Sequence, residues 1–491
     1  MTLQSGVARR TSVRLPADPS RVVIRLFVPG QEPFERQDSR AGAVLRRILD
    51  LDDDDVEAAL DDVVARFKDR HRDLVGTFSR HARELADRLN PADELSESRS
   101  MLLGAAFTSE YAIEGAALCN PSMVLHPDQS GIDTGSARFV MSVRGIGEGH
   151  RSSIGFRTGT VDANGSVSMH DPTAFATIGT TEPAQLSETV FRSELARLND
   201  AGEGADFVFD TLGSHFTREA LDERLNRLEG SLRTRGHGAK TTALIRGIAA
   251  RTYSITFPRE VPIAERVLWP ATEAEAAGME DARFVRFRDD DGSVTFYATY
   301  TAYSGSVISQ QLLATKDFEQ FTSVPLVGRA AANKGLALFP RRINGRFAAM
   351  SRSDRESNSV AYSDDLSVWT DARPCQQPVE AWEALQLGNC GSPIETDAGW
   401  LVLTHGVGPM RTYSIGAILL DLDDPARLLG RLRRPLLSPI QDERDGYVPN
   451  VVYSCGALVH RDTLVIPYGI SDAAIGVATI SLPELLHALT G

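Results

Sequence analysis

The feature that most constrains the fold is a recurrence of turns and strands in the C-terminal half of the chain. Turn-then-strand starts fall at Gly292, Gly345, Gly399 and Asp462, at intervals of 53, 54 and 63 residues. Short strands alternate with these turns, and no long helix is expected before Pro483–Leu489. A four-stranded unit repeating at about 50 residues is typical of a β-propeller blade.

A local repeat supports this interpretation. Residues 315–322 (TKDFEQFT) match residues 363–370 (SDDLSVWT), which places Asp317 and Asp365 48 residues apart. Residues 108–184 and 251–491 together hold about 318 residues, enough for five blades. A pair of packed sheets is the alternative, but the repeated Asp-containing turns favour a mainly β, five-bladed propeller.

Two helical regions are expected beside the β region. Apolar residues between Val56 and Leu89 recur at spacings of three, four or seven, which predicts one long amphipathic helix that ends at Asn90-Pro91. His71 and His81 lie near this stripe, and packing is the favoured interpretation of both. The expected domains are an N-terminal, largely helical extension (1–107), the first part of the propeller (108–184), a helical insertion that packs on the N-terminal helices (185–250), and the rest of the propeller (251–491).

The composition limits the classes of partner that the protein is expected to bind. The chain has 491 residues, a net charge of −14 and a pI of about 5.3, which argues against nucleic acid and anionic membranes as partners. It permits a small neutral ligand, or an anion bound by a local basic cluster, and it leaves a homo-oligomer open. No apolar leader segment and no run of about 18 apolar residues is visible, so we expect a cytoplasmic protein. The four cysteines are far apart, which predicts reduced thiols, and no cluster has metal-ligand spacing.

Two stretches carry functional side chains. Glu280, Asp281 and Arg283 precede a predicted β-hairpin rich in tyrosine, which indicates a sugar or phosphate site; a solvated loop with a surface ion pair is the alternative. Neighbours in an extended segment point to opposite faces, so the two carboxylates are not expected to share one substrate oxygen. Between the predicted strands 137–144 and 154–156, the Gly-rich loop 145–153 carries Glu148, His150 and Arg151, and is either a binding loop or a plain hairpin loop.

Around these residues the chain resembles glycoside hydrolase family 130, the β-mannoside phosphorylases and mannosidases, over about residues 115–170 and 265–491. That family folds as five-bladed β-propellers. The matching motifs are EDAR at 280–283 (family EDPR), KGLALFP at 334–340 (K-x-x-x-LFP), GWLVLTHGV at 399–407 (GWL-x-x-YHGV), LLDLDDP at 419–425 (LLDLxDP) and YGISD at 468–472 (YYGAAD).

The resemblance implies roles for matching residues. Asp281 would be the general acid, with its proton passing through the mannose 3-hydroxyl. Asn120, Arg144 and Asp472 would hold the non-reducing mannose, with Glu280 and Arg283 as further substrate-binding groups. The inorganic phosphate would be bound by Lys334, Arg352 and His405. A phosphorylase needs no second carboxylate, because phosphate is the nucleophile and two or three cations collect it.

Three positions depart from the family pattern: Ala282 replaces a proline, Thr404 a tyrosine and Gln386 a lysine of the family phosphorylases. Glu148 could activate water, or His150 and Arg151 could replace the missing lysine. The resemblance therefore implies an inverting β-mannoside phosphorylase that forms mannose 1-phosphate, with no cofactor other than phosphate as co-substrate. A β-mannoside hydrolase, favoured by Gln386, and a non-catalytic carbohydrate-binding propeller are the alternatives.

Overall fold

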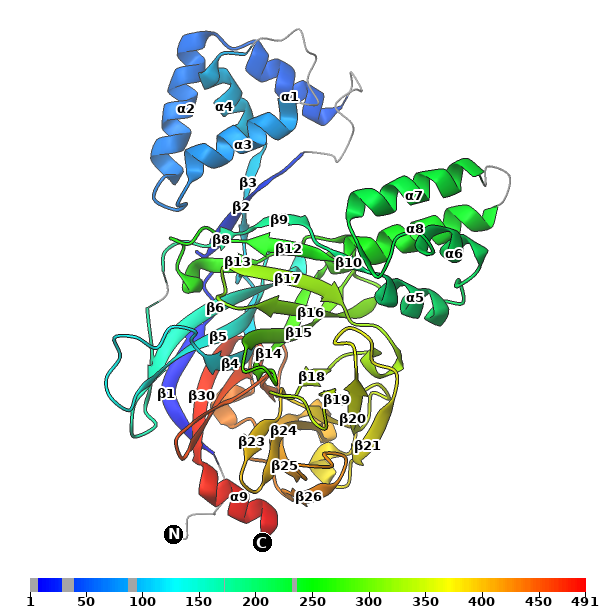
Figure 1. Ribbon diagram of the computed structural model, residues 1–491. Coiled ribbons are helices and arrows are strands. Elements are labelled where there is room, and N and C mark those ends of the chain that lie inside the picture. Colours follow the sequence, from blue (N-terminus) through cyan, green and yellow to red (C-terminus); the bar gives the residue numbers. More distant parts are fainter. Residues whose placement is uncertain (1–7, 29–38, 87–94, 172, 232–235) are drawn as a thin grey trace. The chain divides into compact units, whose positions relative to one another are not determined.

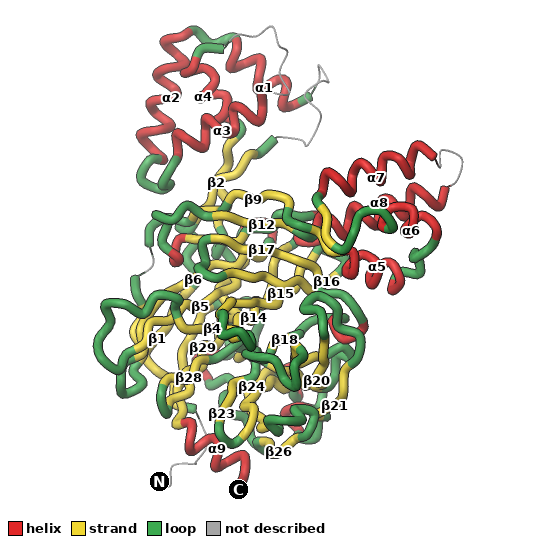
Figure 2. The backbone as a smooth tube through the Cα atoms, viewed as in Figure 1, coloured by secondary structure: helices red, strands yellow, loops and turns green. Residues whose placement is uncertain are grey.

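The computed structural model describes residues 8–28, 39–86, 95–171, 173–231 and 236–491. The chain forms two compact units (Figure 1). The helical unit comprises the described parts of Asp18–Gly115 with Thr173–Thr177. The β unit comprises the described parts of Met1–Ala17, Ala116–Pro172 and Ile178–Gly491. Strands dominate the β unit, and helices dominate the smaller unit (Figure 2).

The helical unit contains four helices among its described residues. They are α1 (Arg40–Leu49), α2 (Asp53–Phe67), α3 (Leu74–Ala86) and α4 (Glu97–Ala106). A two-stranded antiparallel sheet, β2 (Val22–Leu26) with β3 (Thr108–Ala112), accompanies them.

The prediction of one long helix through this unit is wrong. The chain turns between Phe67 and Leu74, and the turn lets Leu60 of α2 and Phe78 of α3 join one apolar core. The buried His71 fixes the turn, because its ring nitrogen lies 2.7 Å from the Glu110 carboxylate. A spacing of seven residues suits a continuous helix and a helical hairpin equally well, so periodicity alone could not show the break.

His81 has the packing role that the sequence predicts: it is buried, and its Nδ1 lies 2.7 Å from the Thr108 hydroxyl. The predicted stop at Asn90-Pro91 lies outside the described residues.

The β unit is built from sheets that follow one another along the chain. The largest sheet runs in the order β4 (Ala117–Leu125), β5 (Ala137–Ile146), β6 (Ser152–Val161), β14 (Gly278–Arg288), β15 (Val294–Tyr303), β16 (Ile308–Thr315), β17 (Gln320–Pro325), β12 (Tyr253–Thr256) and β9 (Thr180–Pro183). Its shorter strands are β7 (Val167–Met169), β8 (Thr177–Ile178) and β13 (Arg266–Leu268).

Three further sheets have four or five strands each. The first is β18 (Ala337–Leu338), β19 (Phe347–Ser351), β20 (Asn358–Ser363) and β21 (Ala372–Gln376). The second is β22 (Gln386–Asn389), β24 (Gly399–Val407), β25 (Tyr413–Leu420) and β26 (Leu428–Arg431), with β23 (Ile394–Thr396) beside β24. The third is β1 (Arg9–Pro16), β30 (Ala474–Ser481), β29 (Thr463–Ile470) and β27 (Val452–Tyr453), with β28 (Leu458–His460) beside β29.

The sequence repeat has a structural counterpart. Asp317 stands between β16 and β17, and its Oδ1 accepts a 2.8 Å hydrogen bond from the Glu319 amide. Asp365 stands between β20 and β21, and its Oδ1 accepts from the Ser367 amide at 2.8 Å. The two aspartates therefore stabilise equivalent turns, each leading into the last strand of a four-strand run.

One strand was assigned to the wrong region. The sequence analysis placed residues 9–16 in the N-terminal extension, but they form β1 and pair antiparallel with β30 of the C-terminal sheet. Arg10 of β1 fixes the pairing, because its guanidinium forms an ion pair with the buried carboxylate of Glu443 at 2.7 Å.

The helical insertion is present as predicted. Its helices are α5 (Glu188–Arg197), α6 (Glu203–Phe209), α7 (Arg218–Ser231) and α8 (Gly236–Ala250), with the short strand pair β10 (Leu186–Ser187) and β11 (His215–Phe216). We expected it to pack on the N-terminal helices, whereas its apolar core includes Val327 and it belongs to the β unit. The predicted C-terminal helix is α9 (Leu482–Thr490), capped by the Ser481 side chain.

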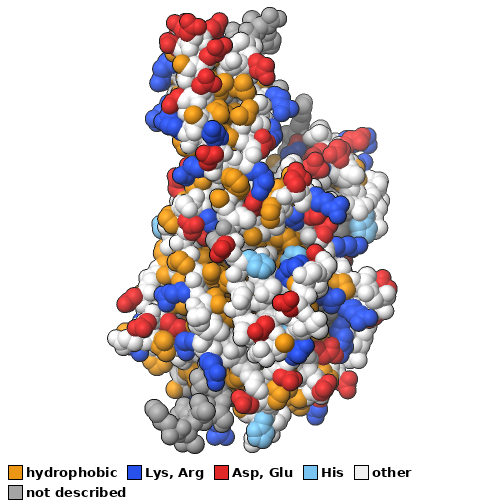
Figure 3. Space-filling view, turned by 90° about the vertical axis from the view of Figure 1, so that its left-hand side faces the viewer, with side chains coloured by type: hydrophobic (Ala, Val, Ile, Leu, Met, Phe, Trp, Pro, Cys, Tyr) orange, Lys and Arg blue, Asp and Glu red, His pale blue; other side chains and the backbone are white. Residues whose placement is uncertain are grey.

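All four cysteines are free thiols, as predicted. Within the described ranges, no helix has the length and apolarity needed to cross a membrane. Acidic and basic side chains are interspersed on the face that Figure 3 presents, so the negative charge is spread there rather than gathered in one field.

Candidate active site

Two β-bulges place the central side chains of the site. The strand register shifts in β4 between Cys119 and Ser122, and in β14 between Glu280 and Arg283. Asn120 and Asp281 lie in these bulges with φ of 49° and 57°. A bulged residue is unpaired and its side chain is re-aimed, and Asn and Asp adopt left-handed backbone more readily than most residues. Such conformations cost of order 1–3 kcal/mol and concentrate at functional sites.

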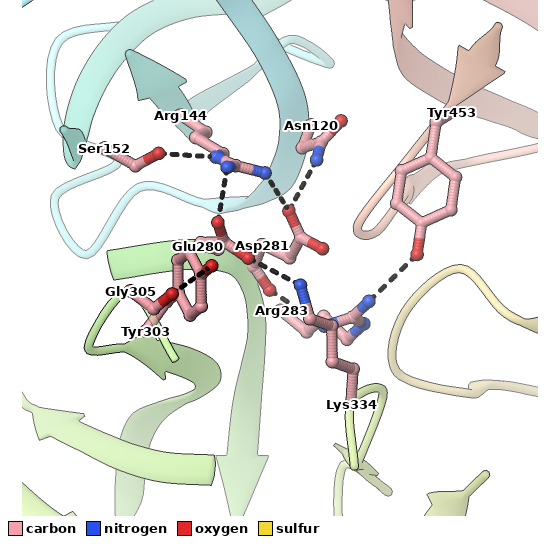
Figure 4. Close-up of polar contacts among 10 residues, drawn as sticks. All are labelled: Asn120, Arg144, Ser152, Glu280, Asp281, Arg283, Tyr303, Gly305, Lys334 and Tyr453. Carbon is pink, nitrogen blue, oxygen red and sulfur yellow. Dashed lines mark hydrogen bonds and ion pairs between the residues drawn. The ribbon is translucent and has the colours of Figure 1, made fainter. Parts of the chain in front are cut away.

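The bulges bring together what we call the carboxylate cluster: Asn120, Arg144, Glu280, Asp281, Arg283 and Lys334 (Figure 4). Asn120 Nδ2 donates to Asp281 Oδ1, and Arg144 Nη1 donates to the same oxygen at 3.2 Å. Both of the side-chain hydrogen bonds that the described residues make to Asp281 go to Oδ1. Its Oδ2 therefore remains available to a substrate.

The two adjacent carboxylates lie on one side of the strand. Glu280 accepts from Arg144 Nη2 at 2.6 Å and from Lys334 Nζ at 2.6 Å, so one guanidinium contacts both Glu280 and Asp281. The expectation of opposite faces is wrong here, because the left-handed backbone at Asp281 breaks the strand alternation. Glu280 is held between two cations, which makes it a positioning group for Arg144 and Lys334.

Electrostatics keep Asp281 ionised in the free site. Burial raises the pKa of the Asp281 carboxyl, but the charges of Arg144, Arg283 and Lys334 outweigh burial and hold its pKa well below the usual range. This matters for an acid, which must carry a proton when it reacts.

Arg283 is a buried member of the carboxylate cluster. Its Nη1 donates to the backbone carbonyl of Asp281 at 2.9 Å, and its Nη2 donates to the Tyr453 hydroxyl at 2.9 Å. Arg283 therefore fixes the strained backbone of Asp281. Tyr453, on β27, is a site residue that the sequence reasoning missed, because a single tyrosine in a short strand carries no distinguishing pattern.

Asp472 behaves differently from Asp281. It follows β29 with φ of 53°. Burial raises its pKa to about 6; Arg144 opposes this shift, and the negative charge of Asp281 adds to it. The sequence thus supplies two carboxylates of the same type, and their surroundings push their pKa values apart.

A second group of residues, which we call the Arg352 cluster, comprises Arg352, Gly388, Asn389 and His405. Arg352 Nη1 lies 2.9 Å from Nε2 of His405. Burial, together with the charges of Arg352 and Arg283, lowers the pKa of His405 well below its ordinary value. His405 is therefore neutral in the free site: its Nε2 accepts from Arg352, and its buried Nδ1 has no hydrogen-bond partner among the described residues. The expectation of a cationic histidine is wrong, because burial beside an arginine disfavours the charged ring.

Glycine at position 388 makes this contact possible. In the pairing of β22 with β24, Gly388 stands opposite His405. A Cβ at 388 would lie 2.5 Å from His405 Cε1 and 2.9 Å from Arg352 Cδ. Gln386, two residues earlier on β22, projects from the same face, so it is directed to the side of the strand where His405 lies.

The Gly147–Ser153 loop makes its contacts elsewhere. His150 Nδ1 lies 2.8 Å from the Tyr447 hydroxyl. Arg151 Nε donates to the Ala276 carbonyl at 3.2 Å, and its guanidinium lies over the Trp269 ring at 5.6 Å. Glu148 is exposed. The structure gives these three residues surface contacts and does not join them to the carboxylate cluster.

Among the described residues, no group of three or more His, Cys, Asp or Glu side chains is arranged to hold a metal ion. The site instead offers a carboxylate with a free oxygen and neighbouring cations. This combination suits an enzyme that cleaves a glycosidic bond with the help of an anion.

Comparison with known proteins identifies the family. The family model described as beta-1,4-mannooligosaccharide phosphorylase, glycoside hydrolase family 130, matches residues 235–490, just over half of the chain. The 1,2-beta-oligomannan phosphorylase of Thermoanaerobacter sp. (strain X514) is 33% identical over 243 residues, which are 49% of this chain and 79% of that protein. The chain therefore belongs to glycoside hydrolase family 130.

Two further similarities are to beta-1,2-mannobiose phosphorylase of Listeria innocua, one in sequence and one to a solved structure. The beta-1,2-mannobiose phosphorylase of Listeria innocua is 34% identical over 230 residues, which are 45% of this chain and 63% of that protein. A solved structure of the Listeria innocua beta-1,2-mannobiose phosphorylase with beta-1,2-mannobiose has a TM-score of 0.44 at 22% identity, and covers 82% of this chain and 95% of that one.

Proposed function

We propose that the protein is an inverting β-mannoside phosphorylase that cleaves a β-mannosyl disaccharide or oligosaccharide with inorganic phosphate to give mannose 1-phosphate. One observation carries the proposal: Asp281 has a free Oδ2 and shares its site with cations that a phosphate dianion would neutralise. The phosphorylase names of the relatives support it.

The cations imply that phosphate binds before Asp281 takes up the proton that it delivers. A dianion that pairs with Lys334 weakens the positive field that keeps Asp281 ionised in the free site, so the pKa of Asp281 rises when phosphate binds. Asp281 is then able to hold the proton that an acid must deliver. Lys334 is suited to this role because it is partly exposed and is held only by Glu280 among the described residues.

The chemical step balances as follows. A phosphate oxygen forms a bond to C1 of the mannose from the face opposite the leaving group, and the bond between C1 and the glycosidic oxygen breaks. Asp281 gives its proton to that oxygen, through the mannose 3-hydroxyl, and the proton that leaves the new phosphate monoester replaces it. Asn120, Arg144 and Asp472 bind the non-reducing mannose. No cofactor other than phosphate enters the step.

A β-mannoside hydrolase is the second candidate. Two observations favour it: Gln386 stands where the family phosphorylases have a lysine, and His405 is neutral, so the site has fewer cations than expected. A non-catalytic carbohydrate-binding protein would be indicated by loss of Asp281 or Asp472, and both are present.

We also propose that the β unit is a five-bladed propeller. Five strand groups support this arrangement: β4–β7, β14–β17, β18–β21, β22–β26, and β27–β30 together with β1, with β8–β13 and the helical insertion between the first group and the second. Each group contributes one site residue or more, namely Asn120 from the first, Asp281 from the second, Arg352 after β19 of the third, His405 from the fourth and Tyr453 from the fifth. We propose a cytoplasmic location as well.

The test is release of reducing sugar from β-1,2- and β-1,4-linked manno-disaccharides with and without inorganic phosphate, with mannose 1-phosphate assayed directly. We expect phosphate-dependent formation of mannose 1-phosphate. Phosphate-independent release of mannose would overturn the phosphorylase in favour of the hydrolase. No turnover of any β-mannoside under either condition would favour the binding protein.

A further inference from the structure

A buried amide without a hydrogen-bond partner lies in the Arg352 cluster. Asn389, at the end of β22, is 1% exposed, and neither its Nδ2 nor its Oδ1 has a hydrogen-bond partner in the described structure. Buried polar side chains are paired in most proteins, and each unpaired group costs about 1–3 kcal/mol. An amide left unpaired on both atoms therefore points to a ligand that supplies both an acceptor and a donor.

Arg352 presents a second unpaired atom at the same place. Its Nε is buried without a partner, while its Nη1 is held by His405. The loop that carries Lys334 continues into Gly335, whose φ is +97°. A Cβ on Gly335 would stand 3.7 Å from Asn389 Oδ1 and 3.8 Å from Arg352 Nε. There is thus room for an atom in ordinary contact with both groups, beside the backbone of Lys334.

The chemistry of these atoms selects among anions. Arg352 Nε and Asn389 Nδ2 can only donate, so they suit oxyanion oxygens, while Asn389 Oδ1 can only accept. Inorganic phosphate keeps at least one proton on oxygen at neutral pH and can donate to Oδ1. Sulfate has the same shape but carries no proton at neutral pH. One of its oxygens would therefore face Oδ1 of Asn389, and the two acceptors would repel each other.

We propose that Asn389 binds the inorganic phosphate co-substrate and selects it over sulfate, with Nδ2 donating to one phosphate oxygen and Oδ1 accepting from a P–OH group. The proposal rests on the phosphorylase function proposed above. It makes Asn389 a binding residue for the anion, and makes His405 and Gly388 positioning residues that hold Arg352 next to it.

The test compares wild-type protein with Asn389→Leu, which keeps the size of the side chain and removes both polar atoms. We expect the KM for phosphate to rise about tenfold or more, from the loss of one or two hydrogen bonds to a charged ligand, while kcat at saturating phosphate stays within about threefold. The ratio of the inhibition constant for sulfate to the KM for phosphate should fall toward one in the variant.

The matched control is Asn358→Leu. Asn358 is also buried, on β20, but its Nδ2 donates to Gln376 at 2.9 Å, so only its Oδ1 lacks a partner in the described structure. This variant should lose stability and keep the wild-type KM for phosphate and the wild-type discrimination against sulfate. An equal rise in KM in both variants would mean a general effect of burying leucine, and would overturn the proposal.

Two measurements on wild-type protein keep the proposal testable if Asn389→Leu fails to fold. Sulfate should inhibit at least tenfold more weakly than phosphate binds, as expected for one opposed pair of acceptors. Equal potency of the two anions would overturn the selection by Asn389. Calorimetric titration of wild-type protein with phosphate and with sulfate is the second measurement, and equal dissociation constants for the two anions would overturn the selection by Asn389. Turnover assays of wild-type protein keep the two proposals distinct: phosphate-independent hydrolysis overturns the function, whereas phosphate-dependent turnover without discrimination against sulfate overturns only the role of Asn389.

Discussion

The carboxylate cluster and the Arg352 cluster lie in one β unit and differ in how completely their polar atoms are paired. In the first, Arg144 donates from three nitrogens to Ser152, Glu280 and Asp281, and both carboxylate oxygens of Glu280 accept, so that of the cluster's buried nitrogens only Arg283 Nε lacks a partner among the described residues. In the second, Arg352 Nε and both amide atoms of Asn389 are buried without partners. The first cluster is organised before substrate arrives, and the second becomes satisfied only when a ligand binds.

The difference indicates that the sugar meets a site that is already organised, whereas the anion completes the site when it binds. A paired network holds a sugar-binding geometry in place without reorganisation at the moment of reaction. An unpaired, cationic group stores unfavourable energy that an anion relieves. Substitutions in the two clusters should therefore have different effects: those in the carboxylate cluster, Lys334 excepted, should lower kcat, and those in the Arg352 cluster should raise the KM for phosphate.

The largest effect is expected from Asp281→Asn. Loss of the acid should lower kcat by about 10²–10⁴-fold, measured as mannose 1-phosphate formed from a β-manno-disaccharide. The melting temperature should change by only a few degrees. The variant no longer buries a charged carboxylate, and this partly offsets the lost attraction to Arg144. Wild-type kcat in a folded Asp281→Asn protein would remove Asp281 from the role of acid.

Gly388→Ala should show the next largest effect, on the other cluster. The new Cβ would meet His405 Cε1 at 2.5 Å and force it away from Arg352, so we expect the KM for phosphate to rise by about tenfold and kcat to change less. Gly247→Ala is the control, because a Cβ there meets no atom within 4 Å. An unchanged KM in Gly388→Ala would mean that the Arg352–His405 contact does not serve the anion.

Asp472 gives a pH-dependent prediction of intermediate size. Its pKa rises from an ordinary 3.8 to about 6 on folding, so the folded state binds the proton more tightly than the unfolded state. The contribution to stability is present below pH 4 and is lost as pH rises through 6. Relative to Asp472→Asn, the wild-type free energy of unfolding should fall by up to about 3 kcal/mol across this window. Denaturant titrations of both proteins at several pH values measure this free energy. A difference between wild type and Asp472→Asn that does not change with pH would contradict the raised pKa.

The smallest effect is expected from Gln386→Lys. The new ammonium would project from the face of β22 on which His405 lies, so it should lower the KM for phosphate by about three- to tenfold, as expected for a partly exposed charge. Gln386→Met, which adds no charge, is the control. An equal change in both variants would show that side-chain shape, rather than the lysine charge, accounts for the effect.

The sequence predicted the mainly β character, the helical insertion and most residues of the carboxylate cluster, because strand alternation, turns and short motifs are local signals. The helical hairpin at Phe67–Leu74 could not be predicted, since the spacing of its apolar residues suits one helix equally well. The pairing of β1 with β30 was missed because the two strands are joined only by tertiary contact.

Other features depend on three-dimensional surroundings. The neutral state of His405 follows from its burial beside Arg352 and Arg283, which the sequence does not show. The sequence reasoning missed Tyr453, Gly388 and Asn389 for the same reason. Their importance comes from residues that are distant in the sequence and close in the fold. The orientation of Glu280 and Asp281 was mispredicted because a bulge interrupts the alternation on which the prediction depended.

The pairing of β1 with β30 has a consequence for biosynthesis. Thr11 bonds to Val477, 466 residues later, so a strand made early has no partner until nearly all of the following chain has left the ribosome. During that interval β1 is an unpaired strand, available to other nascent chains or to chaperones. Completion of the C-terminal sheet should therefore be a late step of folding, and folding yield should depend on how well β1 is protected until then.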